Sequence, residues 1–390
     1  MTTHFSRRRP LHCAATAASA ALFVLAADAH AQSSVTLYGI VEDGLVYTNN
    51  QKGGATLQAT TGATNTSRVG LRGAEDLGGG YRAVFTLENG FDASTGKLGQ
   101  GGLLFGRTAS VGIASPYGTV TAGRQYEPVS EYLGSLSSAL QWAGWTGAHP
   151  GDVDNMQSTI RFNNSLEYAS PAWNGFSFKA MFAPGGVAGS FARQRAMSFG
   201  AGWQGAFGGV SAAYLNLNDP SVSAYGGTVL PGQTGYASPV ASPIYSGYAS
   251  ADTLQIVGAG ANVTLAGLRL DAIYTNTRYQ NVQPTATTPF RGGTAQFNTV
   301  EVNGSYRFAP QLLTGAAFIY TKGETAKYTQ INLGADYSLS RRTDIGLIGV
   351  WQHATGTDST GKAAVADIAS LSASSTPNQV AIRLNLRHRF

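Results

Sequence analysis

The sequence predicts an all-β fold: a 16-stranded antiparallel transmembrane β-barrel with short periplasmic turns, long extracellular loops and an inward-folded third loop. Three observations support this prediction. Apolar and polar residues alternate with a period of two in many short segments, and the connections between those segments alternate between short and long. Charged residues make up only 12% of the chain, about half the usual share for a soluble globular protein. In a bilayer, strands satisfy all their hydrogen bonds only when they close into a barrel.

Residues 1–31 have the layout of a cleaved secretory signal peptide, which leaves residues 32–390 as the barrel domain. A positive cluster at 7–9 precedes an apolar run at 14–27, and small residues surround a cleavage point before Gln32. The alternative, a transmembrane anchor, is disfavoured because the run is too short to cross about 30 Å of hydrocarbon. The chain is therefore predicted to be exported.

The composition of the exported part fits a barrel. Cys13 is the one cysteine, and its removal with the signal peptide leaves no disulfide to stabilise the fold. No stretch after residue 31 approaches 18 consecutive apolar residues, so helical membrane spans are excluded. The net charge of +5 for the whole chain is too small to indicate a nucleic-acid partner.

Sixteen strand-like segments follow, an even number, as single-chain bacterial barrels normally have. They lie near residues 35–48, 66–75, 81–91, 104–115, 119–127, 159–170, 175–183, 196–205, 209–217, 252–264, 268–279, 297–308, 311–321, 327–338, 343–353 and 378–390. In the last segment Ile382, Leu384 and Phe390 share one face, and Arg383 and Arg387 share the other. An edge strand of a soluble sandwich would show the same pattern, so this strand alone leaves both folds open.

Connection lengths favour the barrel over the sandwich. Every second connection is short and rich in turn-forming residues, as at Asp76–Gly80 and Leu339–Arg342. The intervening connections are longer and polar, near residues 49–65, 92–103, 128–158, 184–195, 218–251, 280–296, 322–326 and 354–377. A soluble sandwich has no reason to separate its loops by length in this way, whereas a transmembrane barrel does.

At the level of motifs, the chain resembles the general porins of beta-proteobacteria, of the Neisseria, Burkholderia, Bordetella and Comamonas type. The resemblance is carried by Ser34–Ile40 (S-V-T-L-Y-G-I), by the glycine-rich block Ser67–Gly80 leading into Phe85–Phe91, and by the terminal Phe390, which matches a C-terminal assembly signal. It implies a homotrimer of barrels, each narrowed by the third loop. The expected partners are lipid and lipopolysaccharide of the cell outer membrane and the β-barrel assembly machinery.

The third long connection, Glu127 to Gln157, is the candidate constriction. Leu133, Leu136 and Leu140 have helical spacing and indicate a short helix packed inside the barrel. The apolar content of this loop argues against the alternative, an exposed loop outside the barrel. A barrel of sixteen strands is too wide for side chains to fill, so it encloses an aqueous channel whose selectivity depends on its narrowest point.

Charged residues are predicted on both sides of that narrowest point. The basic wall is Arg68, Arg72, Arg82, Arg107, Arg124 and Arg161, and the acidic side is Glu88, Glu127, Glu131, Asp152 and Asp154. An arginine facing lipid at mid-bilayer costs roughly 2–4 kcal/mol, so most of these arginines are expected to face the lumen. For Arg161 the alternation places Ile160, Phe162 and Leu166 on the opposite face. By resemblance, Arg68, Arg107 and Arg161 match the family's aperture arginines, with Glu88 and third-loop carboxylates opposite them.

These features predict passive diffusion of small hydrophilic solutes and ions, with a preference for anions. One alternative is a substrate-specific channel for a sugar or organic acid, in which Tyr38, Trp142 and Trp145 would stack on the solute. Another is an adhesive role for the loops 218–251 and 354–377.

No enzyme, cofactor or metal site is predicted. The glycine pattern at 200–205 fits a dinucleotide fingerprint, but a strand rather than a helix follows it. His149, His353 and His388 are widely separated, which argues against a metal cluster. A hydrolase with a Ser/His or Asp/His group at the barrel rim is the remaining enzymatic alternative.

Overall fold

A computed structural model describes residues 33–62, 64–285, 288–290 and 292–390. The predicted signal peptide, residues 1–31, lies outside these residues. The strands are β1 (Ser34–Gln51), β2 (Gly54–Thr61), β3 (Arg68–Gly78), β4 (Tyr81–Gly90), β5 (Thr108–Ser115), β6 (Gly118–Gln125), β7 (Phe162–Ala169), β8 (Phe176–Ala183), β9 (Ala196–Gln204), β10 (Gly208–Asn218), β11 (Ala251–Leu265), β12 (Leu268–Val282), β13 (Ala295–Ala309), β14 (Leu312–Lys322), β15 (Ala326–Ser338), β16 (Thr343–Gly356) and β17 (Asn378–Arg389).

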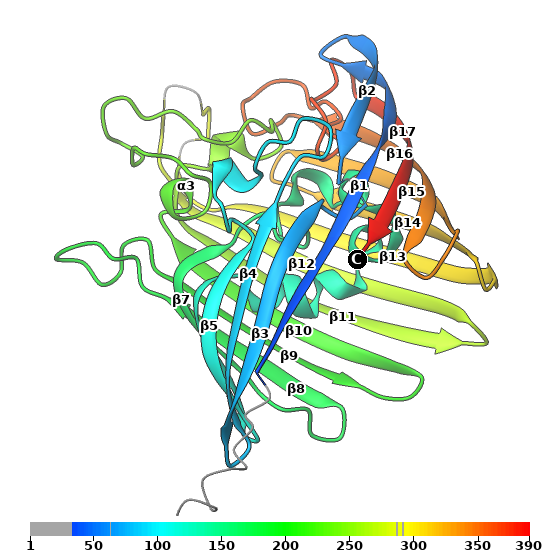
Figure 1. The fold of residues 1–390 in the computed structure, drawn as a ribbon. Coiled ribbons are helices and arrows are strands. Elements are labelled where there is room, and N and C mark those ends of the chain that lie inside the picture. Colours follow the sequence, from blue (N-terminus) through cyan, green and yellow to red (C-terminus); the bar gives the residue numbers. More distant parts are fainter. Residues whose placement is uncertain (1–32, 63, 286–287, 291) are drawn as a thin grey trace, which may run out of the picture.

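The sheet is antiparallel throughout and closes on itself, because β17 pairs with β1 in a register that sets Ile40 opposite Arg389. The backbone of Phe390 extends this seam by exchanging two hydrogen bonds with Gly39, at 3.1 and 3.2 Å. Figure 1 shows the tilted strands as a ring with the helical turns of the third loop inside it. The predicted closed barrel is confirmed.

Two of the labelled strands, β2 and β3, form one wall position of the barrel. Both pair with β1, with Thr61 opposite Asp43 and Ala74 opposite Ser34, so they are two parts of one strand, separated between Thr61 and Arg68. The barrel therefore has the predicted sixteen strand positions. The prediction of a long loop over residues 49–65 was wrong, because β1 and β2 form a hairpin that turns at Lys52–Gly53.

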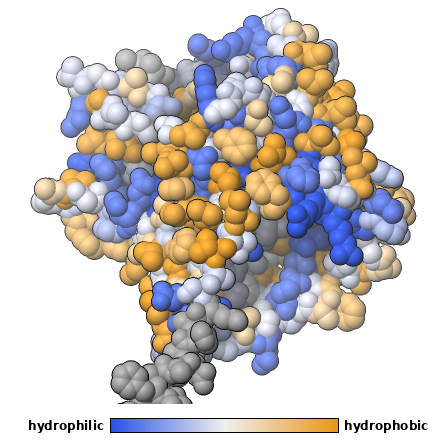
Figure 2. Space-filling view, in the orientation of Figure 1, coloured by the Kyte–Doolittle hydropathy of each residue, from blue (hydrophilic) through white to orange (hydrophobic). Residues whose placement is uncertain are grey.

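Side chains alternate between the two faces of the wall, as the last strand predicted. Arg383, Asn385 and Arg387 are buried on the inner face of β17, whereas Leu384 and Leu386 on the outer face are each 53% exposed. Figure 2 shows apolar side chains gathered on the wall that faces the viewer. Among the described residues, no helix is long and apolar enough to cross a membrane.

Loop three, the connection of residues 126–161 between β6 and β7, folds into the barrel. It consists of short turns: α2 (Pro128–Tyr132), two turns at Gly134–Leu136 and Ala139–Ala143, and two more at Trp145–Gly147 and Pro150–Asp152. The first packs against β9 and β10, the second against β11 and β12, and the third against β15. The predicted apolar packing is seen at Leu133 and Leu136, which are buried, while Leu140 is 39% exposed.

This packing overturns one expectation from alternation. Ile160 and Phe162 are buried in the interior cluster with Val129, Leu133 and Met156. They were expected on the face opposite Arg161, and therefore toward lipid. The reason is that loop three supplies an apolar surface inside the barrel, so an apolar side chain near its end is stable on the inner face. Leu166, farther along β7, is 53% exposed as expected.

A buried ion pair lies at the closing seam. Glu42 on β1 is fully buried, and one of its carboxylate oxygens is 3.2 Å from Nη2 of Arg383 on β17. The same carboxylate accepts hydrogen bonds from the backbone N–H groups of Thr64, at 2.7 Å, and Asn65, at 2.6 Å. Glu42 thus stabilises both the β1–β17 seam and the segment that joins β2 to β3.

Candidate functional site: the aperture beside loop three

The aperture cavity, of about 450 Å³, lies between loop three and the barrel wall. Its lining is Gly62, Thr64, Asn65, Thr66, Arg68, Glu88, Arg107, Tyr126, Ser130, Glu131, Ser135, Leu140, Trp145, Gln157, Ser158 and Arg161. Five of the eleven charged residues singled out from the sequence come together here. They are three arginines and two carboxylates. Arg68, Glu88 and Arg107 come from the neighbouring strands β3 and β4 and the position just before β5, whereas Glu131 and Arg161 come from loop three.

Glu88 on β4 is the acidic centre of the cavity. Arg107 Nε donates a hydrogen bond of 2.6 Å to Glu88 Oε1, and the Tyr38 hydroxyl donates one of 2.9 Å to Oε2. Arg68 Nε lies 3.7 Å from Oε2. Glu88 and Arg107 are both less than a tenth exposed. Burial strengthens this pair because the protein interior screens charge less than water does.

Tyr126 positions two of the arginines. The Arg161 guanidinium lies 4.9 Å from the centre of the Tyr126 ring, and that of Arg107 lies 5.7 Å from it. Cations are attracted to the faces of aromatic rings, so this ring holds two positive groups side by side that would otherwise repel. Tyr126 was not among the predicted site residues. Its place two residues after Arg124, near the end of the predicted strand 119–127, was the one available signal.

The second carboxylate of the cavity is also paired. Glu131 Oε2 lies 2.6 Å from Nζ of Lys179 on β8, and the same amine is 3.2 Å from Glu167 on β7. Lys179 and Glu167 were both missed, since a lysine and a glutamate in separate predicted strands give no indication of contact. The pairs Arg107–Glu88 and Lys179–Glu131 leave Arg68 and Arg161 as the less compensated charges.

Three predicted arginines lie outside the aperture cavity. Arg72 lies over the Tyr38 ring at 5.4 Å. Arg82 is exposed beside the short β3–β4 turn, opposite Asp76 in the register. Arg124 sits at a register shift in β6, where Nε donates to the Gly106 carbonyl at 2.8 Å and Nη1 donates to Asn163 at 2.6 Å. Alternation indicated their strands but not their height in the barrel.

Glu127 differs most from its expected place on the acidic side. It is fully buried and caps the N-terminus of α2, where its carboxylate accepts from the N–H groups of Val129 (2.6 Å) and Ser130 (3.0 Å). Asn155 and Ser198 donate to the same carboxylate at 2.9 and 2.8 Å. Burial raises the pKa of Glu127 to about 7. The proline after it was a usable signal, because proline favours the first position of a helix.

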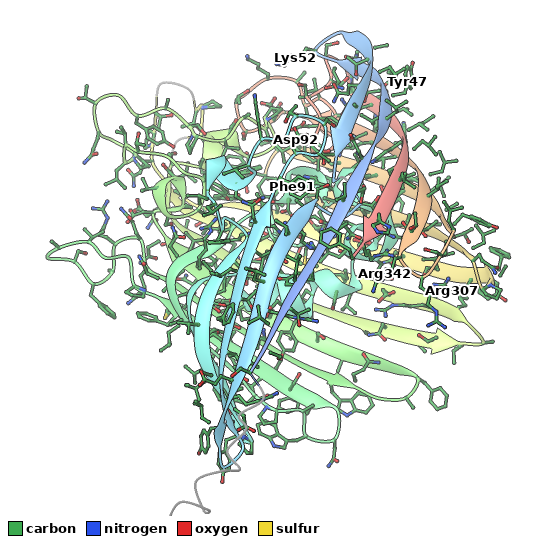
Figure 3. All side chains as sticks on the ribbon, viewed as in Figure 1. Tyr47, Lys52, Phe91, Asp92, Arg307 and Arg342 are labelled. Carbon is green, nitrogen blue, oxygen red and sulfur yellow. The ribbon has the colours of Figure 1, made fainter. Side chains whose placement is uncertain are left out.

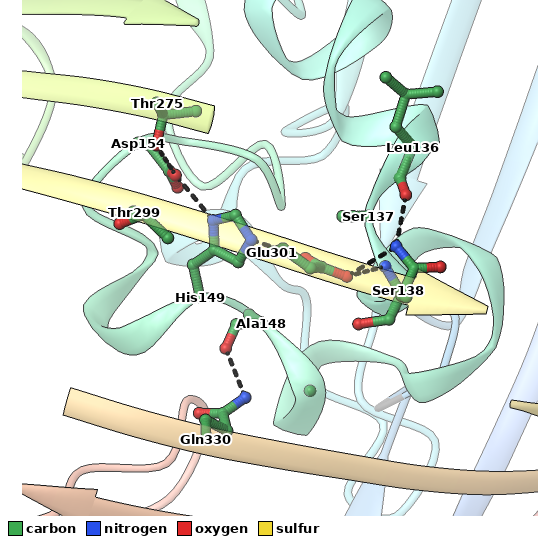
Figure 4. A network of polar contacts seen from close by, with 12 residues as sticks. Leu136, Ser137, Ser138, Ala148, His149, Asp154, Thr275, Thr299, Glu301 and Gln330 are labelled. Atoms are coloured by element: carbon green, nitrogen blue, oxygen red, sulfur yellow. Dashed lines mark hydrogen bonds and ion pairs between the residues drawn. The ribbon is translucent and has the colours of Figure 1, made fainter. Parts of the chain in front are cut away.

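Asp154 is also fully buried, in a set of ionisable groups that we call the latch: His149, Asp154 and Glu301 (Figure 4). His149 Nδ1 is 2.7 Å from Asp154, and Nε2 is 2.6 Å from Glu301 on β13. The other oxygen of Glu301 accepts the N–H of Ser138 at 2.6 Å. The latch ties loop three to the far wall.

The charge state of the latch follows from its contacts. Burial alone would lower the pKa of His149, but the carboxylates of Asp154 and Glu301 raise it well above its usual range. Burial would raise the pKa of Asp154, and His149 lowers it. The imidazolium therefore donates from both ring nitrogens, one to each carboxylate. Neutral amides extend the contact, since Gln330 on β15 donates to the Ala148 carbonyl at 3.0 Å.

Asp152 faces a different cavity from the one predicted. It accepts a hydrogen bond from the N–H of Gln157 at 2.9 Å and another from the Thr159 hydroxyl. Burial, and then the neighbouring Asp154, raise the pKa of Asp152 to about 7. The described residues include no group of three or more histidine, cysteine, aspartate or glutamate side chains that could hold a metal ion.

Trp142 fixes loop three against the wall by close contact with backbone. A Cβ at Gly315 on β14 would lie 2.3 Å from Cε2 of the indole, and one at Gly334 on β15 would lie 2.6 Å from Cε3. The ring is 5% exposed. Trp142 is therefore packed rather than free to stack on a solute, whereas Trp145 lines the aperture cavity.

The substitution Gly315→Ala is expected to displace Trp142 and, with it, part of loop three. Overpacking of this kind costs about 1–3 kcal/mol, and single-channel recordings should show a changed or unsteady conductance. Gly349→Ala is the matched control, because a Cβ there meets nothing within 4 Å. Equal conductance in both variants would contradict the docking role of Trp142.

A closed barrel of sixteen strands, with a charged cavity beside a loop folded into its bore, defines the class of transmembrane β-barrel channels. Residues 14–356 match the family model described as Gram-negative porin, and the chain belongs to that family. This membership locates it in the bacterial outer membrane.

Two curated relatives match parts of the chain. An outer membrane porin protein of Bordetella pertussis is 38% identical over 176 residues, which are 41% of this chain and 45% of that protein. Outer membrane porin protein 32 of Delftia acidovorans is 38% identical over 168 residues, 40% of this chain and 46% of that protein. The matched regions thus span about half the length of these relatives.

Solved structures match over nearly the whole barrel. An anion-selective porin from Comamonas acidovorans has a TM-score of 0.72 at 21% identity, covering 92% of this chain and 100% of that chain. The trimer form of OmpT, an outer membrane protein of Vibrio cholerae, has a TM-score of 0.62 at 13% identity, covering 92% and 99%. At these identities the likeness shows the fold.

Proposed function

We propose that the chain forms a water-filled pore for passive diffusion of small hydrophilic solutes and ions, with a preference for anions. The observation that carries the proposal is the charge balance of the aperture cavity. Three arginines line it against two carboxylates, and each carboxylate already has a cation within 2.6 Å. The remaining positive potential attracts anions at the narrowest charged region of the bore.

The aperture residues that we propose are Arg68, Arg107 and Arg161 on the basic side, with Glu88 and Glu131 opposite. Arg161 is the most informative of these for a test, since no carboxylate lies within 4.0 Å of it in the described part of the chain. Its guanidinium instead contacts Tyr126 and the Thr159 carbonyl.

Reversal potentials across planar bilayers under a KCl gradient test this proposal. The wild type is expected to pass chloride more readily than potassium. Arg161→Gln should lower that permeability ratio several-fold, because the attraction between two opposite unit charges about 4 Å apart in water is about 1 kcal/mol. Arg82→Gln removes the same charge outside the aperture cavity and should have a much smaller effect. Cation preference in the wild type, or equal shifts in both variants, would reject the arginine aperture.

We also propose a homotrimer, which the family resemblance implies and a trimeric neighbour such as the Vibrio cholerae protein supports. The same recordings report it as closure in three equal steps. The signal peptide at residues 1–31 and the assembly role of Phe390 remain proposals of the same kind. Because the chain belongs to a family of channels, we propose transport rather than hydrolysis as its activity.

A further inference from the structure

A second cavity, the outer cavity, opens above the aperture at the long-loop end and has a volume of about 400 Å³. Loop three contributes Trp145, Gly151, Asp152 and Thr159; the β10–β11 connection contributes Ala241, Ser242 and Tyr245; the β16–β17 connection contributes Asp367 and residues 369–373; and Lys52 comes from the β1–β2 hairpin. Trp145 lines both cavities. A solute in the outer cavity therefore lies beside the entrance to the aperture.

Two carboxylates face the outer cavity without a cation. Asp367 is 7% exposed, and its Oδ2 accepts a hydrogen bond of 2.5 Å from the Ser242 hydroxyl. In the described ranges no hydrogen-bond donor reaches its other oxygen. Neither Asp367 nor Asp152 has a lysine, arginine or histidine nitrogen within 4.0 Å among those residues. Burial raises the pKa of Asp367 to about 6.

Buried carboxylates without a cation are unfavourable, because the few hydrogen bonds that they accept replace their lost hydration only in part. The basic side chain in the lining is that of Lys52, at the exposed tip of the β1–β2 hairpin (Figure 3). Within the described part of the chain, it forms no ion pair with a carboxylate. With both carboxylates ionised, the lining has two negative charges against this one positive charge. The outer cavity is therefore acidic above a basic aperture.

Aromatic side chains complete the site. Tyr245 is fixed by ring contacts with Tyr225, at 5.6 Å, and Tyr279, at 6.1 Å. Both Asp152 and Asp367 are close enough to raise the pKa of its hydroxyl, after the larger effect of burial. Trp145 adds an indole that is only partly buried. Carboxylates next to aromatic rings recognise ammonium groups on apolar bodies, and a cavity of this size suits a small molecule.

We propose that the outer cavity binds a small organic ammonium ion, with Asp152 and Asp367 as its charge partners and Trp145 and Tyr245 as contacts for its apolar body. A bound ion of this kind stands at the entrance to the aperture and obstructs the chloride path from the long-loop side. The inference goes beyond the proposed passive pore, since it assigns a saturable site to one face of it.

Single-channel recordings of the full chain in planar bilayers test the proposal, with benzylammonium chloride as the probe and benzyl alcohol as its uncharged counterpart. Millimolar benzylammonium is expected to reduce the chloride current when added on the long-loop side, and to do so far less from the other side. Benzyl alcohol at equal concentration should leave the current unchanged. The charge removed by Asp367→Asn or Asp152→Asn should weaken the block about tenfold.

Asp92→Asn is the matched control, because Asp92 also lies at the long-loop end but does not line the outer cavity (Figure 3). Benzylammonium should block this variant as strongly as it blocks the wild type. Absence of block, equal block by benzyl alcohol, or block unchanged in both aspartate variants would overturn the proposal. If one variant failed to insert, the other and the two-sided wild-type comparison would still decide. A working anion-preferring pore without block would refute this site alone, whereas absence of any pore would refute the proposed function.

Discussion

Replacing His149 with alanine is expected to release loop three from the wall. The change leaves Asp154 and Glu301 buried without their shared cation, and breaking a buried ion pair from one side costs about 3–5 kcal/mol. Single-channel recordings should then show larger and noisier conductance with weaker anion preference. His388→Ala is the control, since that histidine is exposed on β17 and its ring shares a hydrogen bond of 2.9 Å with the Thr343 hydroxyl.

Removing the two carboxylate charges left unpaired by His149→Ala should reverse part of the effect of that substitution. The triple variant His149→Ala, Asp154→Asn, Glu301→Gln is expected to be steadier than His149→Ala alone, because no unpaired buried charge remains. If His149→Ala conducted like the wild type, the latch would not hold the loop.

The same site gives a pH dependence with a definite sign. The pKa of His149 is raised in the folded state, so the latch contributes fully below the ordinary histidine pKa and is lost as the pH rises through the raised value. The pKa of Asp154 is lowered, so its contribution is present above its ordinary value and is lost as the pH falls through the lowered one. We therefore expect loop three of the wild type to loosen at alkaline pH, which single-channel recordings should show as larger and noisier conductance. The His149→Ala variant should show no such change with pH.

The second large effect is expected at the closing seam, for Arg383→Met. It leaves the Glu42 carboxylate buried, and among the described residues its remaining donors are the backbone N–H groups of Thr64 and Asn65. The cost should again be about 3–5 kcal/mol, visible as a lower temperature for loss of the compact band in gel electrophoresis of unboiled samples.

The pair of substitutions Glu42→Met and Arg383→Met should be more stable than Arg383→Met alone, because apolar residues can replace a buried pair at little cost. Arg389→Met is the surface control. Its partner is Asp344, at 2.8 Å, but Arg389 is 40% exposed, and exposed pairs contribute about 0–1 kcal/mol. A loss of stability in Arg389→Met as large as in Arg383→Met would show that burial is not the cause.

The parts of the fold that sequence predicted best are those where lipid enforces alternation. Leu384 and Arg383 could be assigned to opposite faces because a membrane strand has one apolar and one polar side. The hairpin at Lys52–Gly53 was missed because residues 48–54 are polar or glycine, and the short alternation at Ala55, Leu57 and Ala59 that follows was read as part of a loop. A two-residue turn ending in glycine was still readable there as a hairpin.

The candidate site was predicted less completely, because charge does not reveal depth. Glu88 and Glu127 are equally acidic in the sequence, yet one faces the aperture and the other caps a helix. Lys179 and Tyr126 were missed since their roles depend on contacts between distant strands. Asp154 was assigned to the correct loop but meets His149 rather than an arginine. Local sequence therefore identified the loop and the wall, while tertiary packing chose which charges meet.

The attachment of loop three to the far wall constrains the order of assembly. His149 and Glu301 are 152 residues apart, and Ser138 and Asn332 are 194 apart. Contacts of such high contact order form slowly, because a long segment must first be arranged. A chain in which only the first half has folded lacks β13 and β15, the strands to which loop three attaches. By the same measure the seam between β1 and β17 is slower still, because Glu42 and Arg383 are 341 residues apart. We therefore expect loop three to dock on the wall before the ring of strands closes.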